Sequence, residues 1–222
     1  MKNAAPRQAG GPGTPAATRR RPANAKSDLS RRQILDAAAK LFQQQGYAAT
    51  TLRQIAQKAK MKAGSIYYHF DSKSEILDEV LRLGLESVFG SVRAGLSELP
   101  ATASHRERIE CAIACHLDAL LEHGDYTSAS IHTYRQLPKS LKRKHYRLRE
   151  DYGAFWEGLF RDARDAGEIQ DDLLLQPLRM FVLGALNWTV EWYDRKRYPV
   201  SELAEKVSLL IFDGIGAQQK KP

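Results

Sequence analysis

Cysteine is scarce in this sequence, because Cys111 and Cys115 are the only two among 222 residues. They lie four residues apart within one expected helix, so both side chains share a helix face and cannot join distant segments. A disulfide framework like those of small secreted proteins is therefore excluded. This use of cysteine fits a reducing, cytoplasmic environment.

Long apolar runs are also missing. The longest, residues 180–186, is followed by Asn187 and Glu191, and it is far shorter than the roughly 20 residues that cross a bilayer. Residues 1–27 contain no apolar run either, which argues against a secretory signal despite the three arginines at 19–21. We therefore expect a cytoplasmic protein that does not enter the membrane.

Signatures of catalysis are absent as well. The sequence has no nucleophile elbow, no glycine-rich phosphate loop and no His-Glu-x-x-His arrangement. We therefore expect neither an enzyme nor a bound cofactor or metal.

Positive charge is unevenly distributed along the chain. Residues 1–73 carry 14 Lys and Arg against 3 Asp and Glu, whereas residues 74–222 carry 20 against 23. Exposed cations attract polyanions, so the first third of the chain is expected to face nucleic acid. Residues 1–27 are rich in Pro, Gly and Arg and cannot bury enough apolar surface to fold, which predicts a disordered basic arm.

From residue 30 onward, apolar residues recur at helical spacing with no credible pair of strands. The sequence predicts helices over 30–46, 50–59, 63–69 and 72–96, the first and fourth beginning with the capping-box patterns Ser30-x-x-Gln33 and Ser72-x-x-Glu75. Five more are expected over 106–122, 126–136, 139–166, 177–194 and 201–215. The predicted fold is all-α with about nine helices.

Two short helices joined by a tight turn occupy residues 51–70, and the second carries hydroxyl and aromatic side chains. Such a helix reads DNA when the first helix holds it rigidly and one face stays exposed. The stretch Gly64-Ser65-Ile66-Tyr67-Tyr68-His69-Phe70, then Lys73 and Glu75-Ile76-Leu77, closely resembles the DNA-binding domain of the TetR family of transcriptional regulators. The resemblance covers residues 30–80 and implies a helix-turn-helix that enters the major groove.

The resemblance also implies which side chains lie at the DNA. They are Thr51, Arg53, Lys62, Ala63, Gly64, Ser65, Tyr67, Tyr68, His69 and Lys73. The sequence departs from the family in the turn, where Lys60 stands in place of the usual glycine. Glycine is favoured there because such a turn often needs a positive φ, so Lys60 is expected to adopt that φ at a modest cost or to alter the turn.

The remaining helices are expected to form a second domain that dimerises and binds an effector, since proteins of this type read two half-sites as symmetric dimers. The expected domains are a basic arm (1–27), a helix-turn-helix domain (28–75) and an effector-binding and dimerisation domain (76–217). The dimer face is assigned to two apolar stripes, Leu178, Phe181, Val182, Ala185 and Trp192 on one helix and Leu203, Val207, Leu210 and Ile211 on the next. Aromatic candidates for the effector pocket are Tyr134, Tyr152, Trp156 and Trp188.

The expected function is a repressor that binds a palindromic operator as a homodimer and is released by a small hydrophobic effector. Residues 187–193 are similar to a segment of TetR-type regulators of lipid, steroid and aromatic degradation, which suggests a CoA thioester or another hydrophobic acid. A basic run at 139–149 is a candidate for its phosphates. One alternative is a metal- or redox-sensing regulator that uses Cys111, Cys115 and His116, although a closed zinc site needs four ligands. A more remote alternative is an enzyme of unknown class.

Overall fold

The structure, a computed structural model, describes residues 22–121, 124–134 and 137–215. The described residues form nine α-helices and no β-strand, which confirms the predicted all-α class. The helices are α1 (Pro22–Ala49), α2 (Leu52–Lys58), α3 (Ala63–Ile66), α4 (Lys73–Glu98), α5 (His105–Leu121), α6 (Asp125–Thr133), α7 (Lys139–Asp165), α8 (Leu175–Trp188) and α9 (Val200–Ile215), with a 3₁₀ turn η2 (Thr189–Glu191) after α8. None of the described helices is both long and apolar enough to span a membrane.

The start of the first helix differs from its prediction. It begins at Pro22 rather than Ser30, so Ser30-x-x-Gln33 lies inside the helix and does not cap it. Proline is well placed at the first position of a helix, because the missing N–H has no intrahelical acceptor there. Residues 22–27, assigned to the basic arm, are therefore helical, while residues 1–21 of that arm lie outside the described residues.

The ends of several other helices follow local sequence signals. The first helix was predicted to end at residue 46, and helical geometry in α1 is indeed interrupted at Gly46, where φ is 77°. Ser72 caps α4 by accepting a hydrogen bond from the backbone N–H of Glu75 at 3.1 Å. The predicted helix over 177–194 is wrong at its end, because α8 stops at Trp188 and continues only as the short turn η2.

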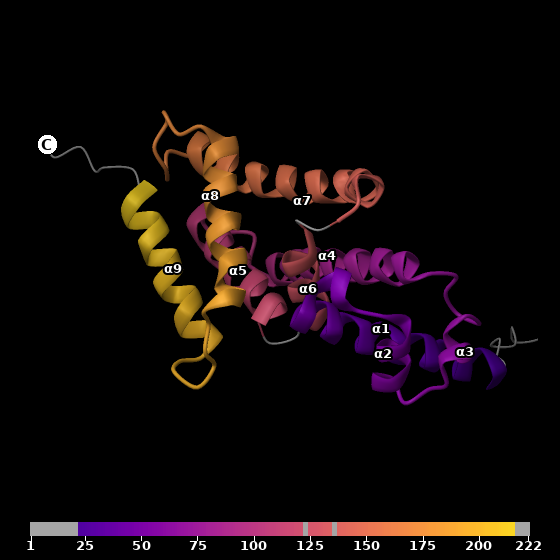
Figure 1. Cartoon of the computed structure of the whole chain (residues 1–222). Helices are drawn as coiled ribbons and strands as arrows, with labels where there is room; N and C mark the ends of the chain where they lie inside the picture. Colours follow the sequence, from indigo (N-terminus) through magenta and orange to yellow (C-terminus); the bar gives the residue numbers. More distant parts are fainter. Residues whose placement is uncertain (1–21, 122–123, 135–136, 216–222) are drawn as a thin grey trace, which may run out of the picture.

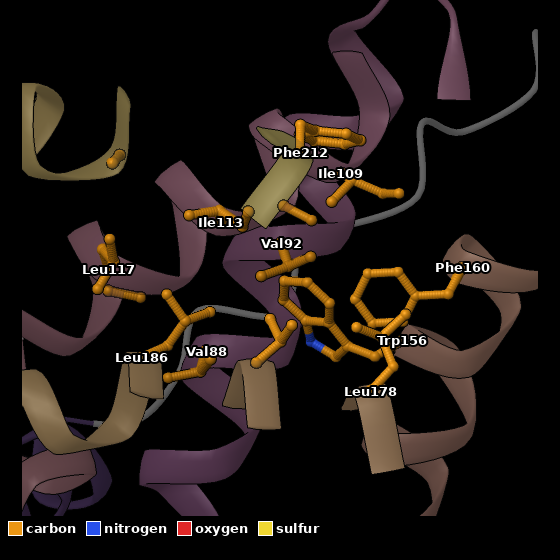
Figure 2. Packing of buried hydrophobic residues seen from close by; sticks show 14 of the residues in the cluster. Val88, Val92, Ile109, Ile113, Leu117, Trp156, Phe160, Leu178, Leu186 and Phe212 are labelled. Atoms are coloured by element: carbon orange, nitrogen blue, oxygen red, sulfur yellow. The ribbon is translucent and has the colours of Figure 1, made fainter. Parts of the chain in front are cut away.

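Two hydrophobic cores hold the chain together, and α4 contributes to both. Figure 1 shows α1–α3 at one end of the molecule and α8 and α9 at the other, with α4 between them. The first core contains Phe42, Ile66 and Phe70 together with Ile76, Leu77, Val80 and Leu81 from the start of α4. The second is built around Val88 and Val92 from its later part and includes Trp156, Phe160, Leu178 and Leu186, as Figure 2 shows. A movement of α4 would therefore disturb both cores.

Helix α6 lies directly against both α1 and α4. Gly84 of α4 makes the close approach possible, because a Cβ there would lie only 2.7 Å from the backbone oxygen of Tyr126. The Tyr126 hydroxyl donates to Asp36 of α1 at 2.6 Å, and Thr127 donates to the backbone oxygen of Gly84 at 3.2 Å. Residues of α6 and the following turn, including Ala129, also pack into the first core. Helix α6 thus ties the amino-terminal helices to the rest of the fold.

The turn between α2 and α3 has a positive φ at Lys60, the position where the resembled family usually has glycine. Lys60 has φ 56°, the only positive φ of a non-glycine residue in the described ranges. Its N–H donates to Gln57 O at 3.1 Å, and Met61 N–H donates to Ala56 O at 2.9 Å, which is the bond pattern of a Schellman motif. The backbone therefore turns as it would with glycine, and the Cβ of Lys60 makes this left-handed conformation sterically unfavourable.

Replacing Lys60 with glycine is accordingly expected to stabilise the fold. Relief of the left-handed conformation is worth ~1–2 kcal/mol, and the greater freedom of glycine in the unfolded chain offsets part of it, which leaves a gain of about 0.5–1 kcal/mol. Urea unfolding monitored by circular dichroism would measure it. Lys58→Gly, at the last residue of α2 where φ is not positive, is the matched control and should destabilise by up to about 1 kcal/mol. A loss of stability in Lys60→Gly would contradict this reading of the turn.

Candidate functional site

The helix-turn-helix begins with a reciprocal cap at Thr51. Its side-chain oxygen accepts from the N–H of Gln54 at 3.2 Å, and the Gln54 side chain accepts from the N–H of Thr51 at 2.8 Å. This capping box fixes the first turn of α2, while Ile55 and Ala56 bury its inner face. Thr51 therefore serves the local structure first, and the exposed start of α2 stays accessible to an anion.

The element assigned to the groove is shorter than predicted but firmly anchored. Helix α3 covers only Ala63–Ile66, and the chain then continues through turns in which His69 and Phe70 N–H groups donate to Ile66 O. Ile66 and Phe70 are buried, at 0% and 1% exposure. These two side chains anchor the segment to the first core. A rigid inner face leaves the opposite face free to be presented to a partner.

Most of the predicted DNA-binding side chains lie on that opposite, exposed face. Tyr67 and Tyr68 are 61% and 88% exposed, although large aromatic side chains normally seek burial. Thr51, Arg53, Lys62, Ala63 and Gly64 are also exposed, while Ser65, His69 and Lys73 are half-buried. Lys58 and Lys60 are exposed too, but they line a pocket together with Asp36 and Lys40 of α1. Exposed aromatic and cationic groups within the segment that spans α2, α3 and the start of α4 suit a nucleic-acid surface.

Lys73 has a structural role that the sequence did not reveal. Its ammonium donates to the backbone oxygens of Tyr47 at 2.8 Å and Thr50 at 2.6 Å, and it lies 4.2 Å from the centre of the Tyr47 ring. Partial burial lowers the pKa of Lys73. The side chain thus connects the start of α4 to the turn before α2. Two of its three N–H groups are used in this way, which leaves one for a phosphate.

Replacing Lys73 with methionine is expected to lower both stability and DNA affinity. The loss of two hydrogen bonds from a charged, half-buried group should cost about 1–2 kcal/mol after solvent screening is allowed for. Thermal unfolding would measure this change, and Lys139→Met at the exposed start of α7 is the control. Unchanged stability in Lys73→Met would show that the two hydrogen bonds have no structural role.

An apolar groove of about 590 Å³ runs along α8 and α9. All nine residues assigned to the dimer face line it: Leu178, Phe181, Val182, Ala185, Trp192, Leu203, Val207, Leu210 and Ile211. Phe181 and Leu210 are 78% and 75% exposed. An apolar patch of this kind marks a surface for another protein surface to cover.

The four aromatic candidates for the effector pocket are not brought together. Tyr152 and Trp156 lie in the second core, and Tyr134 packs beside the first. Trp188 is 64% exposed on α8, seven residues after Phe181, so it shares the face of the exposed stripe. Its assignment to a pocket with the other three is not supported. The aromatic content of the sequence did not reveal which face of α8 would be exposed.

The basic run at 139–149 is partly engaged within the chain. Arg149 and Lys142 lie 4.1 Å and 5.5 Å from the centre of the Tyr134 ring, and Lys144 forms a 2.6 Å ion pair with Asp78 of α4. His145 also contacts Asp78, at 2.8 Å. These contacts couple α7 to α4 and α6. Arg143 and Arg147 are exposed.

The residues of the alternative metal- or redox-sensing site point in different directions. The sulfur atoms of Cys111 and Cys115 are 4.0 Å apart, whereas Nδ1 of His116 lies 2.7 Å from the hydroxyl of Tyr152 in the core. Burial raises the pKa of Cys115 to about 11, so its thiol stays protonated at neutral pH. No group of three or more potential ligands is found within residues 22–121, 124–134 and 137–215.

Comparison with known proteins gives a consistent result. Residues 34–80 match the model for "Bacterial regulatory proteins, tetR family", and residues 102–215 match "Tetracyclin repressor-like, C-terminal domain". The repressor KstR2 of Rhodococcus jostii is 29% identical over 84% of this chain and 91% of its own length. The fatty acid metabolism regulator of Bacillus subtilis is 25% identical over 82% and 94%.

Solved structures share the fold. That of AibR in complex with isovaleryl coenzyme A and operator DNA has a TM-score of 0.74 and 21% identity, and the match covers 82% of this chain and 98% of AibR. The family models together match both halves of the chain, and the second alone matches more than half of it. The chain therefore belongs to the tetR family of bacterial regulatory proteins and is a ligand-responsive, DNA-binding regulator of transcription.

Proposed function

We propose that two copies of this chain pair through the α8–α9 groove and present two α3 segments to successive major grooves of a palindromic operator. The observation that carries this proposal is the exposure of Tyr67 and Tyr68 on an element whose other face is buried. The isologous pairing of one apolar patch with itself gives twofold symmetry, which matches the symmetry of a palindrome. Trp188 extends the same exposed face and joins the proposed interface.

The DNA contacts divide into two kinds. Arg53, Tyr67, Tyr68 and His69 are placed to reach base edges or the sugar-phosphate backbone. Thr51, Lys62 and Lys73 lie at helix starts, where phosphates bind. Ala63, Gly64 and Ser65 have small side chains that allow the backbone to approach the DNA closely. The protein acts as a repressor when this complex covers a promoter.

The effector is proposed to be a hydrophobic acyl group, carried as a CoA thioester or another hydrophobic acid. The names of the relatives support this class, since they include a fatty acid metabolism regulator, and AibR was solved with isovaleryl coenzyme A. Within this chain, the aromatic core around Tyr152 and Trp156 supplies the apolar surroundings that an acyl chain needs. No catalytic role is proposed. Since its proposed partner is bacterial operator DNA, we place the protein in the cytoplasm.

Release from DNA requires a ligand that binds one conformation better than the other. An effector inserted between α5, α7 and α8 would displace α4, which belongs to both cores, and α6, which is tied to α1 through Tyr126 and Asp36. Such a shift alters the spacing of the two α3 segments and lowers their fit to the operator.

The proposal is tested by selecting bound sequences from a random double-stranded library at low ionic strength. The expected result is enrichment of an inverted repeat, with affinity that falls steeply as salt rises. Gel shifts on the enriched sequence then compare octanoyl-CoA with free CoA and octanoate, and release by octanoyl-CoA alone supports the effector class. Failure to enrich any sequence would refute the proposal that the chain reads DNA.

A further inference from the structure

The two cysteines lie together where α5 meets α4. Sγ of Cys111 and Sγ of Cys115 are 4.0 Å apart, and both side chains are half-buried. They are the only cysteines in the sequence, so a reagent that is selective for a thiol pair has one target in this chain. His116, the next residue, does not join them, because its Nδ1 lies 2.7 Å from the Tyr152 hydroxyl. We call Cys111 and Cys115 the dithiol.

Both sulfur atoms lie against the backbone of α4 at Gly95. A Cβ at Gly95 would overlap Sγ of Cys115 and would lie 3.4 Å from Sγ of Cys111. No side chain therefore separates the dithiol from the main chain of α4. Close-packed contacts of this kind leave little space for additional atoms. A group bonded to both sulfur atoms is therefore expected to displace α4 relative to α5.

The spacing of the dithiol suits a bridging atom better than a disulfide. Cβ atoms of residues four apart on a helix are about 5–6 Å from each other, whereas a disulfide needs about 3.5–4.5 Å between Cβ atoms and about 2.0 Å between sulfur atoms. Disulfide formation would therefore distort α5. One atom bonded to two sulfur atoms at about 2.3 Å, the length of a zinc–thiolate bond, spans up to about 4.6 Å between them. The observed separation of 4.0 Å lies within that span.

The charges around the dithiol favour an uncharged product. Burial, the Cys111 thiol and the carboxylates of Asp118 and Glu98 raise the pKa of Cys115 to about 11. A Cu⁺ ion prefers thiolate ligands, but two thiolates around it leave one negative charge beside these carboxylates. Zinc needs four ligands, and no group of three or more potential ligands exists in the part of the chain that the structure describes. Trivalent arsenic that carries one organic group satisfies both limits, because it forms two bonds to sulfur and the product has no charge.

We propose that the dithiol is a covalent binding site for trivalent organoarsenicals, and that the arsenic bridge displaces α4 and weakens operator binding. With phenylarsine oxide, both S–H bonds and the arsenic–oxygen bond break, two arsenic–sulfur bonds form, and the two protons leave with the oxygen as one water molecule. Arsenic stays trivalent, so the step needs no oxidant or reductant. The effect on operator binding rests on the proposed function, whereas the binding of the arsenical does not.

The expected effect on DNA follows from the position of α4. This helix contributes Val92 to the second core and Ile76 to the first, which also contains Ile66 of α3. A displacement of α4 at Gly95 therefore alters how the DNA-reading segment is placed relative to the second core. Because the operator requires a fixed spacing of two α3 segments, the bridged protein should bind it at least about fivefold more weakly, the lower end of usual coupling between sites.

The binding test treats the full chain with phenylarsine oxide in excess 2-mercaptoethanol and uses native mass spectrometry. The wild type should gain one phenylarsenic unit in exchange for two hydrogen atoms, and ethanedithiol, a competing dithiol, should remove it. Cys111→Ser and Cys115→Ser can each form only one bond to arsenic. Their binding should be at least about 100-fold weaker, because no second sulfur acts at a high effective concentration.

Operator binding is measured by fluorescence anisotropy before and after the same treatment. The wild type should lose affinity at least about fivefold, whereas Cys111→Ser, the matched control, should keep its untreated affinity. Circular dichroism establishes that each variant is folded. If one single-cysteine variant does not fold, the other replaces it, because the loss of either sulfur removes the bridge.

The inference is overturned if the wild type gains no arsenic, if a folded single-cysteine variant binds it as tightly as the wild type, or if the bridged protein binds the operator with unchanged affinity. A disulfide that diamide forms as readily as the arsenical forms its bridge would also contradict it, because the 4.0 Å spacing would then not favour a bridging atom. Absence of sequence-selective DNA binding in the untreated wild type refutes the proposed function, and mass spectrometry still decides whether the dithiol binds arsenic.

Discussion

Replacing Tyr68 with alanine is expected to weaken operator binding by about 10- to 100-fold while leaving thermal stability unchanged. The side chain is 88% exposed, so its removal creates no cavity, and substitutions at such sites usually change stability by less than about 0.5 kcal/mol. A specific base contact is worth about 1–3 kcal/mol, which corresponds to the expected loss. Fluorescence anisotropy on the selected operator and differential scanning calorimetry measure the two quantities.

The chain offers a matched control for this experiment. Tyr146 is 62% exposed on α7, in the second half of the molecule, and Tyr146→Ala should leave operator affinity unchanged. Equal affinity of Tyr68→Ala and the wild type would remove Tyr68 from the interface. An equal loss in both variants would instead point to a general effect of removing aromatic surface.

Introducing a charge into the α8–α9 groove is expected to have the larger effect. Leu210→Glu places a carboxylate at the apolar face that lines the groove, and its side chain is 75% exposed in the single chain. Pairing would bury two such charges in an apolar interface, because an isologous interface contains every substitution twice. We therefore expect this variant to be a monomer. Its operator affinity should fall by more than about 100-fold, because a single helix-turn-helix contacts only half of the operator.

Analytical ultracentrifugation measures the assembly state, and gel shifts measure the affinity. Leu174→Glu is the control, because Leu174 is 73% exposed but lies before α8 and outside the groove. It should remain dimeric and bind DNA normally. A dimeric Leu210→Glu would show that the groove does not form the interface.

Local signals in the sequence were sufficient for much of the fold. Ser72 and Gly46 mark helix boundaries through hydrogen bonding and backbone conformation, both of which depend on neighbouring residues. The positive φ of Lys60 was one of the two outcomes expected because the family usually has glycine there. The start of α1 at Pro22 was missed because residues 22–29 lack an apolar stripe, so periodicity carries no information there.

Contacts between residues that are far apart in the sequence could not be predicted from local signals. The bonds of Lys73 to Tyr47 and Thr50 join residues 26 and 23 positions apart, and nothing in the local sequence indicates them. The pairing of His116 with Tyr152 depends on how α5 and α7 cross, over a separation of 36 residues. Trp188 was assigned to the effector pocket by residue type, and only the packing of α8 reveals that it faces outward. The type of each residue indicated which interactions its side chain could make, whereas tertiary packing determined where that side chain lies.

The backbone contact at Gly84 has a consequence for how the protein responds to its ligand. Side chains between two helices can change rotamer and absorb a small displacement, but here main-chain atoms of α4 and α6 meet directly, with no room for a Cβ. A displacement of either helix at this crossing therefore cannot be absorbed by a change of side-chain rotamer. We expect this crossing to act as a pivot, so that a small rotation of the second core would become a larger displacement of the segment that carries Tyr67 and Tyr68.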